Sequence, residues 1–208
     1  MEDVIIVGGG ISGLACGLRL AEEGISPLVL EKERELGHKA CGEMVVDHVG
    51  TFSIFEFLPK RCIERKFERI IFKFYDREYV RELFTPLFTI NRKKFETILY
   101  RKCKRKGVVI KVGRKVEKIE RKKNFLCIDN EFNTRIVVGA DGFNSIVRKF
   151  IGEKIKEFGF ALSLKLSCKR KLPEIVINKH IIPQGYVWKF PLKKEINFGI
   201  GSVSSKIN

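Results

Sequence analysis

The sequence predicts an α/β fold with α+β elements, in which an α/β domain is interleaved with an antiparallel β-sheet domain. A strand–turn–helix–strand unit over residues 4–31 carries the α/β pattern. Two later stretches are rich in Phe, Ile and alternating basic residues, as antiparallel strands often are. We therefore expect one discontinuous domain over 1–51 and 90–157 and a second, incomplete domain over 52–89 and 158–208.

The first unit begins with Val4–Val7, a short apolar run typical of a buried parallel strand. A glycine-rich turn follows over residues 8–13, and a helix is expected from there to about Glu23, ended by Gly24. Residues 27–30 predict a second buried strand.

A second helix is expected over Arg92 to about Lys106, with Asn91 as its N-cap and Gly107 as its C-cap. Between this helix and residue 157, a parallel strand, a β-ribbon and a return strand are expected over 108–112, 116–119, 125–128 and 135–138. The last fifty or so residues predict antiparallel strands over 162–168, 175–177, 186–190 and 196–200.

Composition narrows the function. No apolar run reaches the roughly 18 residues that a membrane span requires, and the acidic start at Glu2 and Asp3 predicts a cytoplasmic protein. Six cysteines without Cys-x-x-Cys spacing and three scattered histidines predict no metal site. The net charge of +16 indicates either a solvated basic face or an anionic partner, such as a phosphate-bearing cofactor or an anionic membrane surface. We expect no nucleic-acid partner, since no binding module accompanies the charge.

The turn reads Gly8-x-Gly10-x-x-Gly13 between a strand and a helix, which is the context that makes this motif a dinucleotide site. The first glycine permits the tight turn, the second lets a pyrophosphate approach, and the third allows close packing of the helix. The helix N-terminus then offers N–H groups to phosphates. Glu31 ends the next strand, where a carboxylate accepts ribose hydroxyls and disfavours a 2′-phosphate, so FAD or NAD is expected. Ser12 and Lys32 complete this set of candidate cofactor contacts.

Two further segments resemble flavoproteins of the para-hydroxybenzoate hydroxylase class. Gly139-Ala140-Asp141-Gly142, after an apolar strand, resembles the second flavin motif of that class, whose Asp lies near the cofactor pyrophosphate. Asn91–Phe95 resembles its arginine-led helix beside the flavin, which makes Arg92 a candidate cofactor contact; the alternative is a solvated first-turn residue. The resemblance implies FAD as the cofactor and a Rossmann-like FAD-binding domain.

Two more matches resemble one branch of that class, the FAD-dependent geranylgeranyl reductase family, which includes archaeal digeranylgeranylglycerophospholipid reductases. Cys41-Gly42 is similar to the Cys-Gly segment of that family. Tyr186-x-Trp188-x-Phe190-Pro191, followed after seven residues by Gly199-x-Gly201, is similar to its aromatic motif.

This resemblance implies reduction of isoprenoid C=C bonds in a prenyl lipid, with hydride delivered from reduced FAD. Cys41 and Tyr186 are the candidate catalytic residues, and a thiol, a tyrosine or a water could each supply the proton. Cys41 and Gly42 would lie near the flavin; a buried, inert thiol is the alternative for Cys41. The electron donor, NAD(P)H or ferredoxin, is not assigned.

The aromatic motif supplies the candidate substrate residues Tyr186, Trp188, Phe190, Pro191, Gly199 and Gly201. The three rings alternate, so a strand would place them on one face, either lining a prenyl slot or packing on the sheet's own core. The two glycines are expected to admit the ligand closely.

The family also carries a third flavin motif, a Gly-Asp segment downstream of the aromatic motif, which this sequence lacks. We therefore expect a completing protein chain as a partner, or else a truncated, non-catalytic paralogue. A flavin-dependent aromatic hydroxylase is the other alternative, because the fold does not fix the chemistry.

Overall fold

The computed structural model describes residues 1–37, 39–56, 58–168 and 170–204. The chain divides into two compact units, each made of two segments. The first, here called the α/β unit, comprises Met1–His38 and Glu96–Lys154. The second, the β unit, comprises Lys39–Phe95 and Ile155–Asn208.

The expected domain boundary after residue 51 is wrong. The β unit already begins at Lys39, because β3 (Met44–Val46) pairs antiparallel with β7 (Arg77–Ile90). Main-chain hydrogen bonds thus fix this segment to the β unit. The sequence did not predict this pairing, because Met44–Val46 is only a short apolar run.

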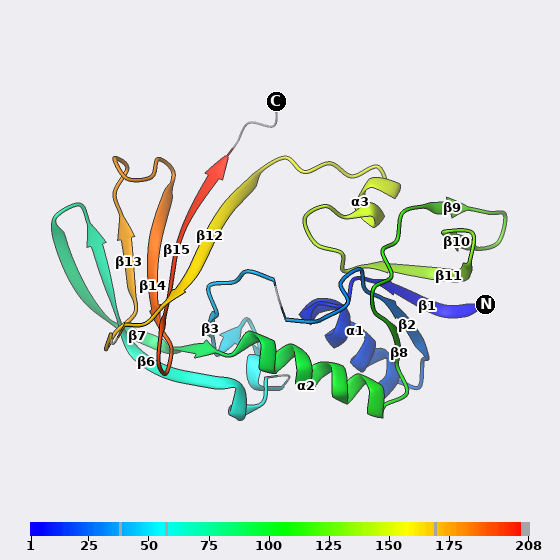
Figure 1. Cartoon of the computed structure of the whole chain (residues 1–208), viewed down its shortest axis with the longest axis horizontal. Helices are drawn as coiled ribbons and strands as arrows, with labels where there is room; N and C mark the ends of the chain where they lie inside the picture. The colour runs from blue at the N-terminus through cyan, green and yellow to red at the C-terminus, as the bar shows by residue number, and fades with distance from the viewer. Residues whose placement is uncertain (38, 57, 169, 205–208) are drawn as a thin grey trace. The chain divides into compact units, whose positions relative to one another are not determined.

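A six-stranded sheet forms the centre of the α/β unit, in the order β8-β2-β1-β11-β10-β9 (Figure 1). The strands of this sheet are β1 (Glu2–Val7), β2 (Pro27–Leu30), β8 (Val109–Lys111), β9 (Ile119–Arg121), β10 (Leu126–Ile128) and β11 (Phe132–Gly139). The strands β8, β2, β1 and β11 run parallel, whereas β9 and β10 form the expected antiparallel ribbon. The strand expected over 116–119 begins only at Ile119, and Val116 lies buried in the core.

Three helices accompany the strands: α1 (Ile11–Glu22), α2 (Arg92–Arg105) and the short α3 (Ile146–Phe150). The predicted caps of α2 are confirmed. The Asn91 Oδ1 atom accepts a hydrogen bond from the Lys94 N–H at 2.8 Å, and Gly107 follows the helix with a φ of +82°.

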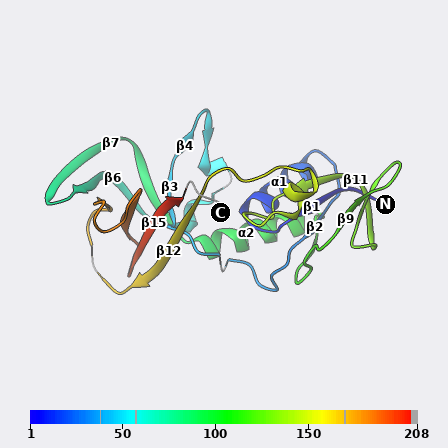
Figure 2. The ribbon, with the colours of Figure 1, turned by 90° about the horizontal axis from the view of Figure 1, so that it is seen from above.

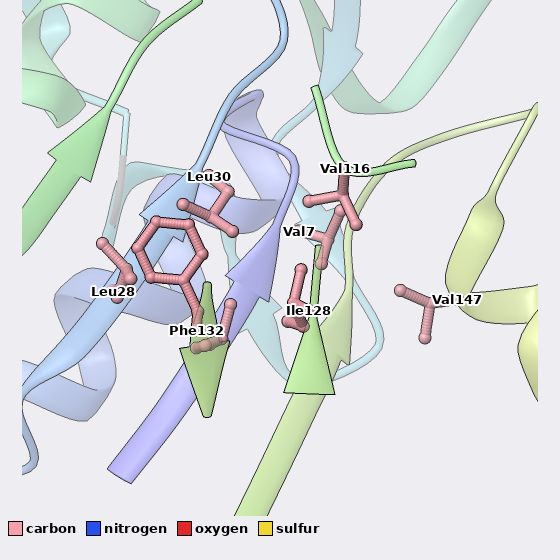
Figure 3. Close-up of a cluster of buried hydrophobic side chains, with 8 residues drawn as sticks. Val7, Leu28, Leu30, Val116, Ile128, Phe132 and Val147 are labelled. Carbon is pink, nitrogen blue, oxygen red and sulfur yellow. The ribbon is translucent and has the colours of Figure 1, made fainter. Parts of the chain in front are cut away.

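One apolar cluster of the α/β unit lies on one face of this sheet (Figure 3). It consists of Ile5, Val7, Leu28, Leu30, Val116, Ile128, Phe132 and Val147. Alternate residues of β1 and β2 enter it, as strand geometry requires. Because Val147 belongs to α3, the cluster also packs this helix against the sheet and holds the loop that precedes it.

A seven-stranded sheet forms the β unit, in the order β12-β15-β14-β13-β6-β7-β3 (Figures 1 and 2). Besides β3 and β7, its strands are β6 (Ile63–Phe74), β12 (Phe158–Leu166), β13 (Glu174–Ile177), β14 (Gly185–Pro191) and β15 (Ile196–Ser204). A small hairpin of β4 (His48–Val49) and β5 (Phe52–Ser53) and two 3₁₀ turns, η1 (Ile54–Glu56) and η2 (Lys60–Cys62), precede β6.

The expectation of a purely antiparallel second sheet is wrong at one position, since β13 pairs parallel with β6. Parallel neighbours need a long crossover, and nearly 100 residues of other structure separate these two strands. The long antiparallel pairs on either side, β6 with β7 and β12 with β15, follow the expected pattern.

Glu174 is buried on β13 among three basic side chains. Its carboxylate is 1% exposed and lies 2.6 Å from the Lys189 Nζ and 3.7 Å from the Lys73 Nζ, and it also accepts from Arg170. Burial raises the pKa of Glu174, but the hydrogen bonds from Lys189 and Arg170 outweigh burial and hold the pKa below its usual value. This cluster ties β13 to β14 and β6.

Replacing Glu174 by Gln should lower the free energy of unfolding by about 2 to 3 kcal/mol at neutral pH, since three basic groups lose their buried partner. Because the pKa of Glu174 is lowered in the folded state, its contribution is present at neutral pH and is lost as the pH falls through that pKa. Urea unfolding across the acid range should therefore show a weaker pH dependence in Glu174→Gln. The matched control is Glu82→Gln, a change at an exposed carboxylate on β7, and equal acid sensitivity in Glu174→Gln and the native chain would contradict the assignment.

Candidate functional site

The glycine turn after β1 is shaped by contacts with the main chain. A Cβ on Gly8 would lie 2.3 Å from the Ala140 oxygen, and Gly8 has a φ of +104°. A Cβ on Gly13 would lie 1.8 Å from the Gly8 oxygen. A Cβ on Gly10, in contrast, would meet nothing within 4 Å. Gly8 and Gly13 therefore let the turn close on itself, and Gly10 leaves the start of α1 open.

The start of α1 has the properties of an anion site. Gly10 is the N-cap and has no side chain to accept from the first N–H groups, and the first turn contains no acidic residue. The uncompensated N–H groups and the helix dipole favour a phosphate at this end. Ser12, the second residue of the helix, is exposed beside them.

Glu31 closes the turn from the neighbouring strand. One carboxylate oxygen accepts from the Gly9 N–H at 2.5 Å and the other from the Glu33 N–H at 2.8 Å. A carboxylate has about four acceptor positions, so two remain, and their use by ribose hydroxyls stays a prediction. Gly9, which the motif ignores, is needed here because its Cβ would lie 2.8 Å from the Glu31 Cβ. Lys32 is exposed and pairs with Glu33 at 3.6 Å, and its contact with a cofactor stays a prediction.

Asp141 lies in the turn after β11. One of its oxygens accepts from the Ile146 N–H at 2.6 Å and the Val147 N–H at 3.3 Å and thereby caps α3. This capping role was not predicted. In the part of the chain that the structure describes, the other oxygen, Oδ1, is buried and has no hydrogen-bond donor.

The glycines around Asp141 keep this turn tight: a Cβ on Gly139 would lie 2.9 Å from the Val147 Cβ, and Gly142 has a φ of +76°. Three features of the α/β unit can therefore bind a ligand: an open helix N-terminus, acceptor positions on Glu31 and an unpaired acceptor on Asp141. Phosphates and hydroxyls, the polar groups of a dinucleotide, match them.

In the β unit, the predicted alternation of three aromatic residues on β14 is confirmed. The Tyr186 and Trp188 ring centroids are 5.9 Å apart, and those of Trp188 and Phe190 are 6.2 Å apart. Trp188 and Phe190 are buried, as the core interpretation requires, whereas Tyr186 is 45% exposed and free to meet a ligand. The core interpretation thus holds for Trp188 and Phe190, and the prenyl-slot interpretation of Tyr186 stays a prediction.

The apolar surface around Trp188 extends across neighbouring strands, which the sequence did not indicate. Ile175 pairs with Trp188 on one side and with Phe72 on the other, and Phe72 pairs with Tyr79. Paired residues point to the same side of a sheet. Together with Tyr186 they form what we call the aromatic face of the β unit.

Gly199 and Gly201 make packing contacts with Trp188 that the sequence did not predict. A Cβ on Gly199 would lie 2.1 Å from the Trp188 Cζ2 atom, and one on Gly201 would lie 3.4 Å from Cζ3. The space at Gly199 is filled by the indole, so the spacing of the aromatic motif reflects this packing. Pro191 is buried, and its carbonyl accepts from the Thr89 hydroxyl at 2.8 Å. Direct contact of these residues with a substrate stays a prediction.

The Cys41–Gly42 segment lies against β14. A Cβ on Gly42 would lie 3.5 Å from the Phe190 ring, and the Asn197 amide donates to the Cys41 carbonyl at 2.7 Å. The Cys41 thiol is half-buried and accepts from the Glu43 N–H at 3.3 Å. Asn197 and Glu43 were missed by the sequence reasoning, although Asn197 is two residues before Gly199 and so on the same face of β15.

The predicted site residues thus fall into two groups. Gly8, Gly10, Ser12, Gly13, Glu31, Lys32, Gly139, Asp141 and Gly142 lie in the α/β unit. Cys41, Gly42, Arg92 and the aromatic motif lie in the β unit, where Arg92 is the half-buried first residue of α2. Within each unit, the structure brings the glycine turn, Glu31 and Asp141 together, and Cys41 and Gly42 with the aromatic strand.

This fold and glycine turn define a flavin-binding protein of the FAD-binding domain family, to which the chain belongs: the family model described as "FAD binding domain" matches residues 1–182. The family consists of FAD-dependent oxidoreductases, and FAD is the cofactor. When bound, it would be held by Gly8, Gly10, Gly13, Glu31 and Asp141.

Among individual relatives, the chain is similar to digeranylgeranylglycerophospholipid reductases. The protein of Methanococcus vannielii is 24% identical over 97% of this chain and 55% of its own length. The Methanocaldococcus jannaschii protein is 26% identical over 96% of this chain and 55% of its own length. An FAD-dependent monooxygenase of Tolypocladium album is 32% identical over 71% of this chain and 34% of its own length. The resemblance predicted from the motifs is confirmed.

The fold is similar to that of solved flavoproteins. A geranylgeranyl bacteriochlorophyll reductase-like protein of Thermoplasma acidophilum matches with a TM-score of 0.77 and 23% identity, over 96% of this chain and 56% of that structure. The chain spans about half the length of the reductases that it matches. Among the helices that the structure describes, none has the length and hydropathy needed to cross a bilayer.

Replacing Gly10 by Ala should leave the fold intact and weaken FAD binding by roughly tenfold or more, equivalent to about 1.4 kcal/mol. The added methyl group meets no neighbour in the chain but occupies the open space before α1, where the pyrophosphate is expected. The measurement is FAD titration by flavin fluorescence together with thermal unfolding. The control is Gly17→Ala in the same helix, whose Cβ would make ordinary contacts at 3.4 Å and beyond. Equal FAD affinity in the two variants would contradict the assigned site.

Proposed function

We propose that the chain is the flavin-binding part of an FAD-dependent reductase that saturates isoprenoid C=C bonds in prenyl lipids. The observation that carries the proposal is the Cys41–Gly42 segment packed against Trp188 and Phe190, with the exposed ring of Tyr186 beside Trp188. An apolar strand face next to a thiol suits a long alkene chain that has no polar group to recognise. The similarity to digeranylgeranylglycerophospholipid reductases supports the same substrate class.

The residues of the chain have separate tasks in this reaction. The aromatic face of the β unit contacts the prenyl chain and excludes water from it. FAD, held by the glycine turn, Glu31 and Asp141, would when reduced supply a hydride to one alkene carbon. The other alkene carbon would take a proton, for which the Cys41 thiol, the Tyr186 hydroxyl and a water are the candidate donors. The alkene would thereby gain two electrons and two hydrogens.

Two partners belong to the proposal. A reduced electron donor, NAD(P)H or ferredoxin, must regenerate the reduced cofactor. Because the chain spans about half the length of its relatives, we also propose that a further polypeptide segment, on this chain or another, supplies the rest of the substrate site.

The direct test is anaerobic. FAD-loaded protein reduced with dithionite and mixed with a geranylgeranyl lipid should yield product heavier by two hydrogens per saturated bond, measured by mass spectrometry. Cys41→Ala and Tyr186→Phe should each lower the rate by roughly 10²-fold or more if the changed group is the proton donor. Cys168→Ala, a change at an exposed thiol, is the control. If FAD binds and no lipid is saturated, with or without the complementing segment, the chain is a non-catalytic paralogue.

A flavin-dependent hydroxylase is the second candidate, favoured by the 32% identity to a monooxygenase. It differs in needing oxygen at the reduced flavin. Oxygen consumption that rises on adding an aromatic substrate, with no saturation of prenyl lipid, would select it over the reductase.

The net charge of +16 further suggests a peripheral contact with an anionic membrane, where prenyl lipid substrates reside. Each Lys or Arg near such a surface contributes about 1 kcal/mol. The protein should therefore sediment with vesicles that contain anionic phospholipid at low salt, and be released at high salt. Equal binding to neutral vesicles, or binding that resists salt, would contradict an electrostatic contact.

A further inference from the structure

Asn197 joins three parts of the β unit through one buried side chain. Its Nδ2 donates to the Cys41 carbonyl at 2.7 Å and to the Glu43 carboxylate at 3.2 Å, and its Oδ1 accepts from the Trp188 indole N–H at 2.9 Å. Asn197 is only 2% exposed. The orientation of the amide is determined by these partners, because a flipped amide would set donor against donor at the indole and acceptor against acceptor at the carbonyl.

Glu43 holds the other end of the same segment. Its main chain is in the left-handed region, with a φ of +57°, which costs a non-glycine residue about 1 kcal/mol or more and persists only where surrounding contacts enforce it. Those contacts are present: the carboxylate is within 2.9 Å of the Lys165 Nζ, and the Glu43 carbonyl accepts from the Ile90 N–H at 2.9 Å.

We propose that Asn197, supported by Glu43 and Lys165, is a positioning residue that holds the Cys41–Gly42–Glu43 segment on the aromatic strand and so determines where the Cys41 thiol lies. Hydrogen bonds to the Cys41 carbonyl and to the Glu43 carboxylate fix the segment on both sides of Gly42. Because the same amide also accepts a hydrogen bond from the Trp188 indole N–H, it lies between this segment and Trp188. The catalytic relevance of the thiol rests on the proposed function, whereas its placement does not.

The same contacts link the segment to the aromatic face of the β unit. Trp188 is fixed by Asn197 on its polar edge and by Gly199 beneath its ring. Movement of the amide therefore changes the thiol and the aromatic face together. Loss of Asn197 should lower kcat for prenyl lipid more than it lowers the affinity for FAD, because the glycine turn proposed to hold the FAD pyrophosphate lies in the other unit.

The test uses Asn197→Ala in the full chain and follows alkylation of each cysteine by iodoacetamide with peptide mass spectrometry. Release of the segment should raise the rate at Cys41 by roughly fivefold relative to Cys168, which corresponds to the about 1 kcal/mol of one net hydrogen bond. Cys168 is exposed and serves as the internal standard, and burial raises the pKa of the Cys103 thiol to about 11, so Cys103 should stay unreactive unless the protein unfolds. The emission of Trp188, the only tryptophan, should shift as its indole loses its acceptor.

Two further variants keep the proposal testable if Asn197→Ala does not fold. Lys165→Gln removes only the partly exposed end of the contact and should raise Cys41 alkylation in the same direction by a smaller factor. Asn133→Ala, an exposed amide on β11, should change neither readout. An unchanged ratio of Cys41 to Cys168 alkylation in folded Asn197→Ala or Lys165→Gln would overturn the proposal. The ratio is measured without substrate, so its outcome is independent of whether prenyl lipid is reduced.

Discussion

The register of three parallel strands is the constraint on which the nucleotide site depends. Val7 of β1 lies beside Leu30 of β2 on one side and Gly139 of β11 on the other. The main chain continues this pattern past the strand ends, since the Gly8 N–H donates to the Leu30 carbonyl and the Ala140 N–H donates to the Val7 carbonyl, both at 2.8 Å. Three segments far apart in sequence therefore turn at the same edge of the sheet, where ligands of open α/β sheets bind.

A comparable constraint organises the β unit around a single indole. Trp188 spans the neighbouring strand at Gly199, donates to Asn197 and stacks near Phe190. Much of the aromatic motif is thus explained by packing, and of its three rings only that of Tyr186 is exposed. A motif that looks like a list of ligand contacts is here mostly the support that presents one ring and one thiol.

The strands, helices and glycine turn were predictable because each has a local cause. Apolar runs of four residues mark β1 and β2, and Asn91 and Gly107 mark the two ends of α2. The spacing of the glycines in the turn is recognisable in the sequence because a side chain at those positions would clash with the main chain or block a ligand. The contacts between distant segments were not predictable from the sequence. The pairing of β3 with β7, the parallel pair of β13 with β6, and the capping of α3 by Asp141 depend on which surfaces meet, and no local propensity encodes this. Asn197 was missed for the same reason, since its three partners are fixed only by the fold.

The interleaved order of the two units has a consequence for how the protein is made. Strand β1 emerges from the ribosome before its partner strands, and one of these, β11, follows about 130 residues later. At roughly 5–20 residues per second, β1 therefore has one edge unpaired for about 7 to 26 seconds. Throughout that interval Val4–Val7 presents unpaired main-chain groups and apolar side chains to other nascent chains. Production of this protein should accordingly depend on chaperone capacity more than that of a protein whose strands pair in chain order.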